Sequence, residues 1–182
     1  MAHGFIIESM IQAKNIDALN RSVTSAVDVD GGGLIALAYP TTKGNDVWTA
    51  SAPSTELGGL WIAYNPEVKY TDVNGKRYAG LSADIRDYTN IAGEVFDAFK
   101  PKVGDELIIS IDAVDATGAS AVAGDILESK AGQTKFTRVA AGTGATAGST
   151  AFKIELVDAI DFPSASIGVE KVKAFKAVCI QE

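Results

Sequence analysis

The chain has 182 residues, enough for one domain or two small ones, and a formal net charge of −7. This acidic balance disfavours nucleic acid as a partner, because phosphate backbones are bound mainly through Lys and Arg. A single His, His3, and a single Cys, Cys179, leave few ligands for a zinc site and exclude an intrachain disulfide. We therefore expect no enzyme activity and no catalytic, cofactor or metal site.

Residues 1–15 are predicted to form an extended arm or an edge strand. This segment lacks the positively charged start of an export signal, since Glu8 splits its apolar residues and no Lys or Arg precedes them. No stretch of the chain approaches the run of about 18 apolar residues that spans a membrane. We expect a protein that is made in the cytoplasm and has no membrane partner.

Two segments, residues 15–29 and 84–99, place apolar side chains three and four residues apart, which predicts two short helices. Ser and Thr residues weaken the first prediction. Gly93 and several β-forming residues favour extended structure for part of the second. Pro101 is expected to end the second segment.

Short apolar runs and alternating patterns predict strands in most of the remaining chain. The segments are 34–39, 47–50, 60–64, 68–73 and 76–80, then 106–111, 134–139, 151–160 and 167–180. Asn74-Gly75 predicts a hairpin between two of them. Gly104-Asp105 and Gly124-Asp125, twenty residues apart, suggest successive strands of a small antiparallel barrel. Residues 140–150 contain only Ala, Gly, Ser and Thr and are expected to form a mobile loop.

The expected fold is mainly β: a small antiparallel β-barrel or sandwich with one or two short helices and an extended N-terminal arm. Three regions are predicted. They are the arm of residues 1–15, a Tyr/Trp-rich β region of residues 16–100, and an antiparallel β-barrel-like region of residues 101–182.

The types of aromatic residue are unevenly distributed along the chain. Both Trp and all five Tyr lie between Tyr39 and Tyr88, whereas all seven Phe lie outside that window. Tyr and Trp combine a large apolar ring with a polar group, so they suit either a core or a surface that contacts a partner. The candidate partner interface consists of Trp48, Trp61, Tyr64, Tyr70 and Tyr78.

Acidic residues give no clear catalytic arrangement. Asp28 and Asp30 resemble the opening of a calcium loop, but Gly32 and Tyr39 occupy its fifth and twelfth positions, so a tight turn is expected. Four further carboxylates are expected to face solvent or end strands, namely Asp112, Asp115, Asp158 and Asp161. A hydrolase would require two of them opposed in a cleft.

Four short strings together resemble a known family. They are DVDGG at 28–32, LWIAYNPEV at 60–68, DYTNIAG at 87–93 and FDAFKPKVGD at 96–105. With these strings the chain is similar to the auxiliary head proteins of tailed bacteriophages and prophages, which decorate the outside of the expanded capsid. The resemblance extends over about residues 15–180.

This resemblance implies a structural virion protein that binds the outer capsid surface and stabilises the shell after synthesis in the bacterial host cytoplasm. The implied partners are the major capsid protein and further copies of the chain, as a trimer or dimer. The N-terminal arm would dock on the capsid through Phe5, Ile6, Ile7, Met10 and Ile11, and its edge could pair with a capsid sheet. The alternatives are a phage fibre or receptor- or glycan-binding head module, with the Tyr/Trp cluster as its ligand face, and a small hydrolase.

Overall fold

In the computed structural model, residues 2–40, 46–55, 57–66, 70–73, 76–79, 84–164 and 168–182 are described. For residues 13, 70–73, 76–79 and 162–164 the description covers the backbone alone. Strands account for 45% of the structure and helices for 11%, and no helix in these described segments reaches seven residues. The predicted mainly β fold is therefore confirmed.

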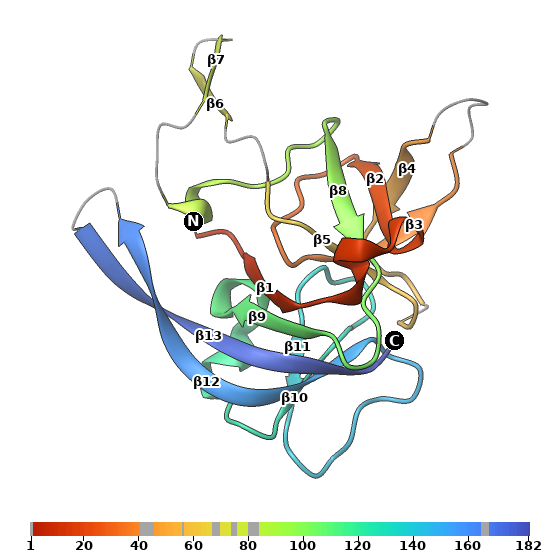
Figure 1. The fold of residues 1–182 in the computed structure, drawn as a ribbon, viewed down its shortest axis with the longest axis vertical. Coiled ribbons are helices and arrows are strands. Elements are labelled where there is room, and N and C mark those ends of the chain that lie inside the picture. Colours follow the sequence, from red (N-terminus) through yellow and green to blue (C-terminus); the bar gives the residue numbers. More distant parts are fainter. Residues whose placement is uncertain are drawn as a thin grey trace.

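The first half of the chain forms a closed five-stranded barrel (Figure 1). Its strands, in order around the barrel, are β2 (Asn20–Ser25), β4 (Trp48–Ser51), β3 (Leu34–Ala38), β5 (Trp61–Ala63) and β8 (Val95–Phe99). β2 runs parallel to β4, and every other pair in the barrel is antiparallel.

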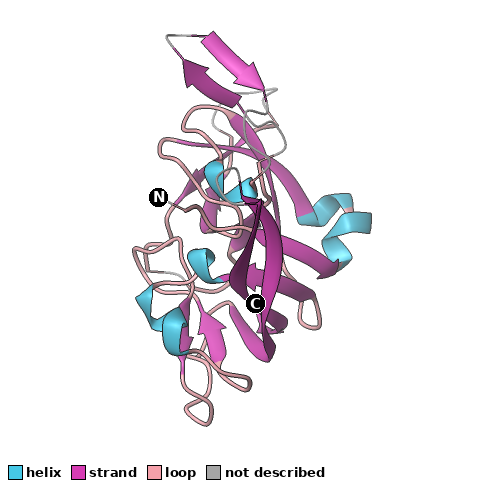
Figure 2. Ribbon diagram, turned by 90° about the vertical axis from the view of Figure 1, so that its left-hand side faces the viewer, coloured by secondary structure: helices cyan, strands magenta, loops and turns pink. Residues whose placement is uncertain are grey.

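The other large element is a six-stranded antiparallel sheet that packs beside the barrel (Figure 2). Its strands, in spatial order, are β1 (Ile6–Met10), β9 (Glu106–Ser110), β13 (Gly168–Gln181), β12 (Ala151–Ser164), β10 (Ile126–Glu128) and β11 (Thr137–Val139). Two further strands, β6 (Tyr70–Val73) and β7 (Lys76–Ala79), pair as a separate hairpin that projects from the body. Val73 lies directly opposite Lys76, which confirms the strand pairing predicted around Asn74-Gly75, although those two residues lie outside the described part.

Both predicted helices, at residues 15–29 and 84–99, are wrong. Each segment contains a strand, and these two strands pair with each other. β2 runs antiparallel to β8, with Val23 opposite Phe96 and Thr24 opposite Val95. The β-branched side chains of Val23, Thr24 and Val95 fit a pleated strand better than a helix. The helices found in the described chain are five short 3-10 segments: η1 (Gln12–Asn15), η2 (Asp17–Leu19), η3 (Ile85–Asp87), η4 (Ile111–Ala113) and η5 (Ala116–Ser120).

Two hydrophobic clusters hold these elements together. The smaller cluster fills the barrel with Val23, Ile35 and three alanines, and such small side chains suit the narrow interior of five strands. The larger cluster joins the barrel to the sheet, with Phe99 contributed by β8 and Phe152 and Phe175 by the sheet. The barrel and the sheet therefore share one continuous core.

Pro101, near which the two regions were predicted to divide, lies between β8 of the barrel and β9 of the sheet. The closed barrel precedes Pro101, and the C-terminal half forms an open sheet. Residues 6–10 belong to that sheet as β1, so this part of the predicted arm pairs within its own chain.

The two Gly-Asp turns have the same construction. Gly104 and Gly124 have φ angles of 97° and 93°, a backbone conformation that favours glycine. The side chain of Asp105 accepts a hydrogen bond from the backbone N of Lys102, three residues earlier, and Asp125 does the same with Val122. The Gly104-Asp105 turn forms backbone hydrogen bonds with β13, and the Gly124-Asp125 turn forms them with β12. Two turns of the same construction thus contact the two strands of the β12–β13 hairpin.

The loop of residues 140–150 is held by Glu128 at the end of β10. Glu128 accepts hydrogen bonds from the backbone N and Oγ1 of Thr146, at 2.7 and 2.8 Å, and from Ser149 Oγ at 3.4 Å. Gln181 donates to the carbonyls of Thr146 and Ser149. Hydrogen bonds thus tie down a loop that has little apolar surface to bury.

Replacing Glu128 with Ala should lower the free energy of unfolding by about 1–3 kcal/mol, because the donors of Thr146 and of buried Ser149 lose a charged acceptor. Urea denaturation measures this change, and limited proteolysis reports whether residues 140–150 become accessible. Glu155→Ala is the control, since Glu155 is exposed and its ion pair with Lys176 spans 3.4 Å. Equal stability losses in the two variants would contradict the role assigned to Glu128.

Candidate functional site

One end of the barrel carries a cluster of aromatic rings around a cation, which we call the barrel-end cluster: Arg21, Tyr39, Trp48 and Trp61. Arg21 lies on β2, Trp48 on β4 and Trp61 on β5, while Tyr39 directly follows β3. The guanidinium carbon of Arg21 lies 5.4 Å from the ring centre of Trp48 and 5.7 Å from that of Trp61. Both distances fall within the range of a cation–π contact.

Tyr39 completes the cluster on its outer side. Its ring centre lies 4.4 Å from that of Trp48, and 77% of Tyr39 is exposed. Trp48 and Trp61 are partly buried against the barrel interior. The arrangement therefore combines a fixed inner part with an exposed ring.

Arg21 retains unused hydrogen-bonding capacity. Its Nη1 donates to the backbone carbonyls of Asp17 and Asn20, at 3.1 and 2.7 Å. Within the described residues, Nε and Nη2 donate to no protein acceptor. A guanidinium has five N–H donors in a rigid plane, so two nitrogens remain able to bind a ligand.

The other predicted interface residues lie elsewhere. The ring of Tyr64 packs 4.8 Å from that of Phe99 where the barrel meets the sheet, and its hydroxyl donates to Asn20 Oδ1. Burial raises the pKa of Tyr64 to about 12, and nearby carboxylates add to this effect. Tyr70 and Tyr78 lie on the β6–β7 hairpin, and their side chains are outside the described part. The predicted interface thus divides among three places.

The predicted docking residues near the N-terminus also divide. Phe5, Ile6 and Ile11 are buried within the chain's own fold, so their side chains are not available to a partner. Ile7 and Met10 are exposed, Met10 to 62%.

The edge of β1 is partly occupied as well. The amide of Asn65 bonds both backbone groups of Ile6, accepting from its N at 3.0 Å and donating to its O at 2.6 Å. The strand also carries a bulge between Glu8 and Met10, and bulges blunt the pairing of sheet edges.

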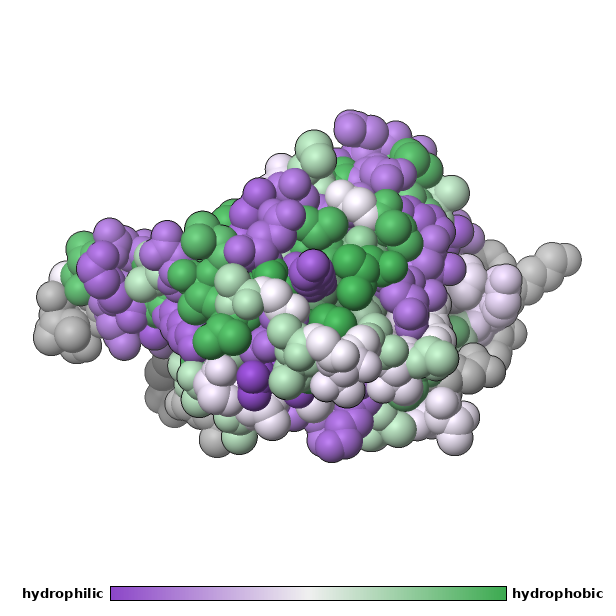
Figure 3. Space-filling view, turned by 90° about the horizontal axis from the view of Figure 1, so that it is seen from below, coloured by the Kyte–Doolittle hydropathy of each residue, from purple (hydrophilic) through white to green (hydrophobic). Residues whose placement is uncertain are grey.

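Ile7 and Met10 belong to a larger surface, which we call the outer sheet face. Cross-strand pairing puts Ile7, Ile108, Lys176 and Leu156 in one row and Met10, Glu106, Val178 and Lys153 in the next. Lys176 pairs with Glu106 at 2.9 Å and with Glu155 at 3.4 Å. Viewed from the side of β12 and β13, hydrophobic residues gather with a few hydrophilic ones among them (Figure 3).

The β12–β13 hairpin extends this sheet beyond the body (Figure 1). Near its tip, side chains on both faces are exposed, among them Asp158, Asp161, Val169, Glu170 and Lys171. Arg86 connects the hairpin to η3, since its Nη2 lies 2.7 Å from Glu170 of β13 and 2.6 Å from Asp84, the N-cap of η3. The hydrogen bond from Arg86 and its positive charge hold the pKa of Glu170 below its usual value.

The acidic residues considered from the sequence are used within the fold or face solvent. Asp28 accepts from the N of Ala92, and Asp30 accepts from the N of Gly4 and contacts His3 Nδ1 at 2.7 Å. Asp115 caps η5 by accepting from the N of Thr117. Burial raises the pKa of Asp112, whereas Asp158 and Asp161 are exposed.

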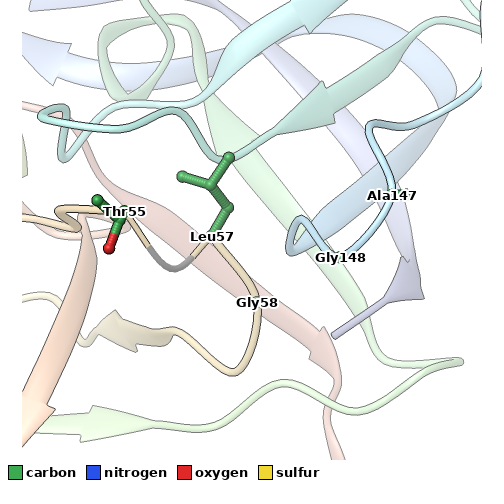
Figure 4. A pocket seen from close by; sticks show the side chains of 5 residues that line it. All are labelled: Thr55, Leu57, Gly58, Ala147 and Gly148. Carbon is green, nitrogen blue, oxygen red and sulfur yellow. The ribbon is translucent and has the colours of Figure 1, made fainter.

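An open hollow of about 390 Å³ lies where two loops meet (Figure 4). Its walls are Thr55, Leu57, Gly58, Ala147 and Gly148. A side chain at Gly58 would come within 2.5 Å of the carbonyl oxygen of Gly148, so this close approach requires glycine. None of the described residues that line the hollow carries a charged side chain.

Sequence reasoning identified Trp48 and Trp61 but missed Arg21 and Tyr39 as their partners. No local pattern reveals Arg21, because only the parallel pairing of β2 with β4 brings it to the tryptophans. Tyr39 lies inside the aromatic window, and its position at the end of a predicted strand was the available signal.

The described residues include no group of three or more His, Cys, Asp or Glu side chains arranged to hold a metal ion. Among them there is also no helix that is long and apolar enough to cross a membrane. Comparisons of the chain with protein-family models, with curated proteins and with solved structures find no match.

Proposed function

We propose that this protein is a structural virion component that binds the outer surface of a tailed-phage capsid and stabilises the shell. The observation that carries the proposal is the β12–β13 hairpin, which projects from the body and exposes the described residues 168–171 on both of its faces. A strand advances about 3.3 Å per residue, so such a ribbon can reach a neighbouring subunit while the body stays in place. The resemblance of four short strings of the chain to decoration proteins is the other ground for this proposal.

The outer sheet face supplies the apolar contact area in this proposal. Ile7, Met10 and Leu156 are exposed on it, and burying such side chains drives most protein association. The proposed partners are the major capsid protein and further copies of the chain. Docking then uses a rigid face of the folded protein, to which residues 6–10 contribute as a strand.

A shortened hairpin tests the proposal. Ile160 lies directly opposite Val172, so replacing residues 161–171 with Asn-Gly should close the hairpin at that pair. We expect this variant to fold and to lose most of its occupancy on capsids, as measured by cryo-microscopy of shells to which it is added. The thermal midpoint, recorded in parallel, separates lost docking from lost folding.

A control leaves the hairpin intact and removes one charge from the opposite side of the molecule. Asp46→Asn changes an exposed residue beside β4 and should leave capsid occupancy unchanged. Full occupancy by the shortened hairpin, or no density for the wild-type protein on any shell surface, would refute the proposed docking.

A further inference from the structure

The barrel-end cluster has the parts of a ligand-binding site. Small-molecule sites combine aromatic surface with a few polar groups that fix the orientation of the ligand. Here Tyr39 and Trp48 supply the rings, and Arg21 supplies the donors. From this geometry we propose that the barrel-end cluster binds a neutral glycan built of pyranose rings.

The rings are held in place before any ligand arrives. Arg21 lies over both Trp48 and Trp61, and its Nη1 is fixed by two backbone carbonyls. A preorganised site loses less conformational entropy on binding than a mobile one. The exposed ring of Tyr39 extends this surface outward, where the apolar face of a sugar ring can stack on it.

The free donors of Arg21 favour a ligand rich in oxygen acceptors. Nε and Nη2 point to no acceptor among the described residues, and sugar hydroxyls accept hydrogen bonds from such groups. A neutral sugar suits the site better than an acidic one, because acidic residues lie beside β2: Asp17 is in η2, which directly precedes it, and Asp97 accepts a hydrogen bond from Ser22.

The surroundings favour a glycan over a protein partner. On β2 and β4, Arg21 and Trp48 share the inward face with Val23 and Ala50, and the exposed residues of the outward face, Ser22, Thr49 and Ser51, are all small and polar. Protein contact sites surround their central Trp, Tyr and Arg residues with further residues that exclude water. The exposed Ile7, Met10 and Leu156 lie instead on the outer sheet face, so the two surfaces are distinct.

Fluorescence provides a direct test, because Trp48 and Trp61 are the only tryptophans in the chain and both lie in the cluster. The full-length protein is titrated with maltohexaose, cellohexaose and chitohexaose. We expect at least one of them to shift or quench the emission with a Kd of about 1 mM or tighter. Tyr39→Ala should weaken this binding about tenfold, since it removes one stacking ring.

A matched pair of variants tests the role of the cation. Arg21→Met keeps the apolar stem and removes the donors, so it should abolish the response, whereas Lys171→Met removes an exposed cation from the hairpin and should not change it. Unchanged emission with all three sugars up to about 10 mM would overturn the proposal. A response to purified major capsid protein alone would identify the cluster as a protein contact. Neither outcome involves the β12–β13 hairpin, so the shortened-hairpin variant tests the capsid proposal independently.

Discussion

Replacing Asp125 with Ala is expected to lower the free energy of unfolding by about 2–4 kcal/mol. Asp125 is 1% exposed, and its carboxylate accepts from the backbone N of Val122 at 3.0 Å, from that of Ala141 at 2.8 Å and from Arg138 Nε at 2.7 Å. Removing it leaves two backbone donors and one cation without their acceptor. Urea denaturation at about pH 7 measures the loss.

Asp105→Ala is the matched control, because Asp105 has the equivalent position in the other Gly-Asp turn and accepts from two backbone donors, those of Lys102 and Gln12, without an arginine. It should cost less than Asp125→Ala, and the difference reports the contribution of Arg138. Equal losses would mean that the ion pair adds nothing measurable.

Asp125 also makes stability depend on pH. The hydrogen bond from Arg138 is the main cause that lowers the pKa of this carboxyl in the folded protein. A lowered pKa stabilises the fold above the pKa of the unfolded chain, about 3.9, and this contribution is lost as the pH falls through the lower folded value. Asp125→Asn should therefore lose less stability than the wild type between about pH 5 and pH 2. A parallel decline in both proteins would show that other groups dominate the acid transition.

Replacing Phe152 with Ala should be the most destabilising single change in the core, at about 3–5 kcal/mol. Phe152 is fully buried, and its ring meets that of Phe136 edge to face with centres 5.6 Å apart. The ring belongs to the cluster that joins the barrel to the sheet, so its loss should destabilise both parts.

Tryptophan fluorescence tests whether the loss of Phe152 destabilises the barrel as well as the sheet, because both tryptophans lie in the barrel and Phe152 lies in the sheet. If the two parts unfold together, tryptophan emission and far-ultraviolet circular dichroism should give one coincident urea transition. Leu156→Ala on the exposed face of the same strand is the control and should cost less than about 1 kcal/mol. A barrel transition that Phe152→Ala leaves unmoved would show that barrel and sheet unfold separately.

The features that local sequence predicts are those built from neighbouring residues. The Asn74-Gly75 hairpin and the Gly-Asp turns were visible because their conformations depend on particular short residue pairs. Strand content followed from alternation. The predicted helices failed because Val23 and Phe96 lie at helical spacing within their own segments yet face one another across two strands.

Other features could not be predicted because they depend on distant pairing. Nothing near Ile6 indicates that it will lie opposite Ile109, and nothing near Arg21 indicates a parallel neighbour that carries Trp48. The interface predicted from aromatic composition therefore contained the two tryptophans but assigned Tyr64 to a partner surface, although it packs within the fold. Composition identifies residue types, and topology decides which of them meet.

The position of β1 has a consequence for how the chain folds. In chain order the barrel strands lie between β1 and β9, the first two strands of the sheet. β1 therefore cannot pair until β9, about one hundred residues later, has been synthesised. Contacts this distant in sequence slow folding, because the intervening loop must be closed first. During synthesis the barrel segment emerges earlier, with Leu34, Ile62 and Phe99 still uncovered. The barrel segment is therefore synthesised before β9, and we expect the sheet, in which β1 and the C-terminal β13 lie on either side of β9, to form last.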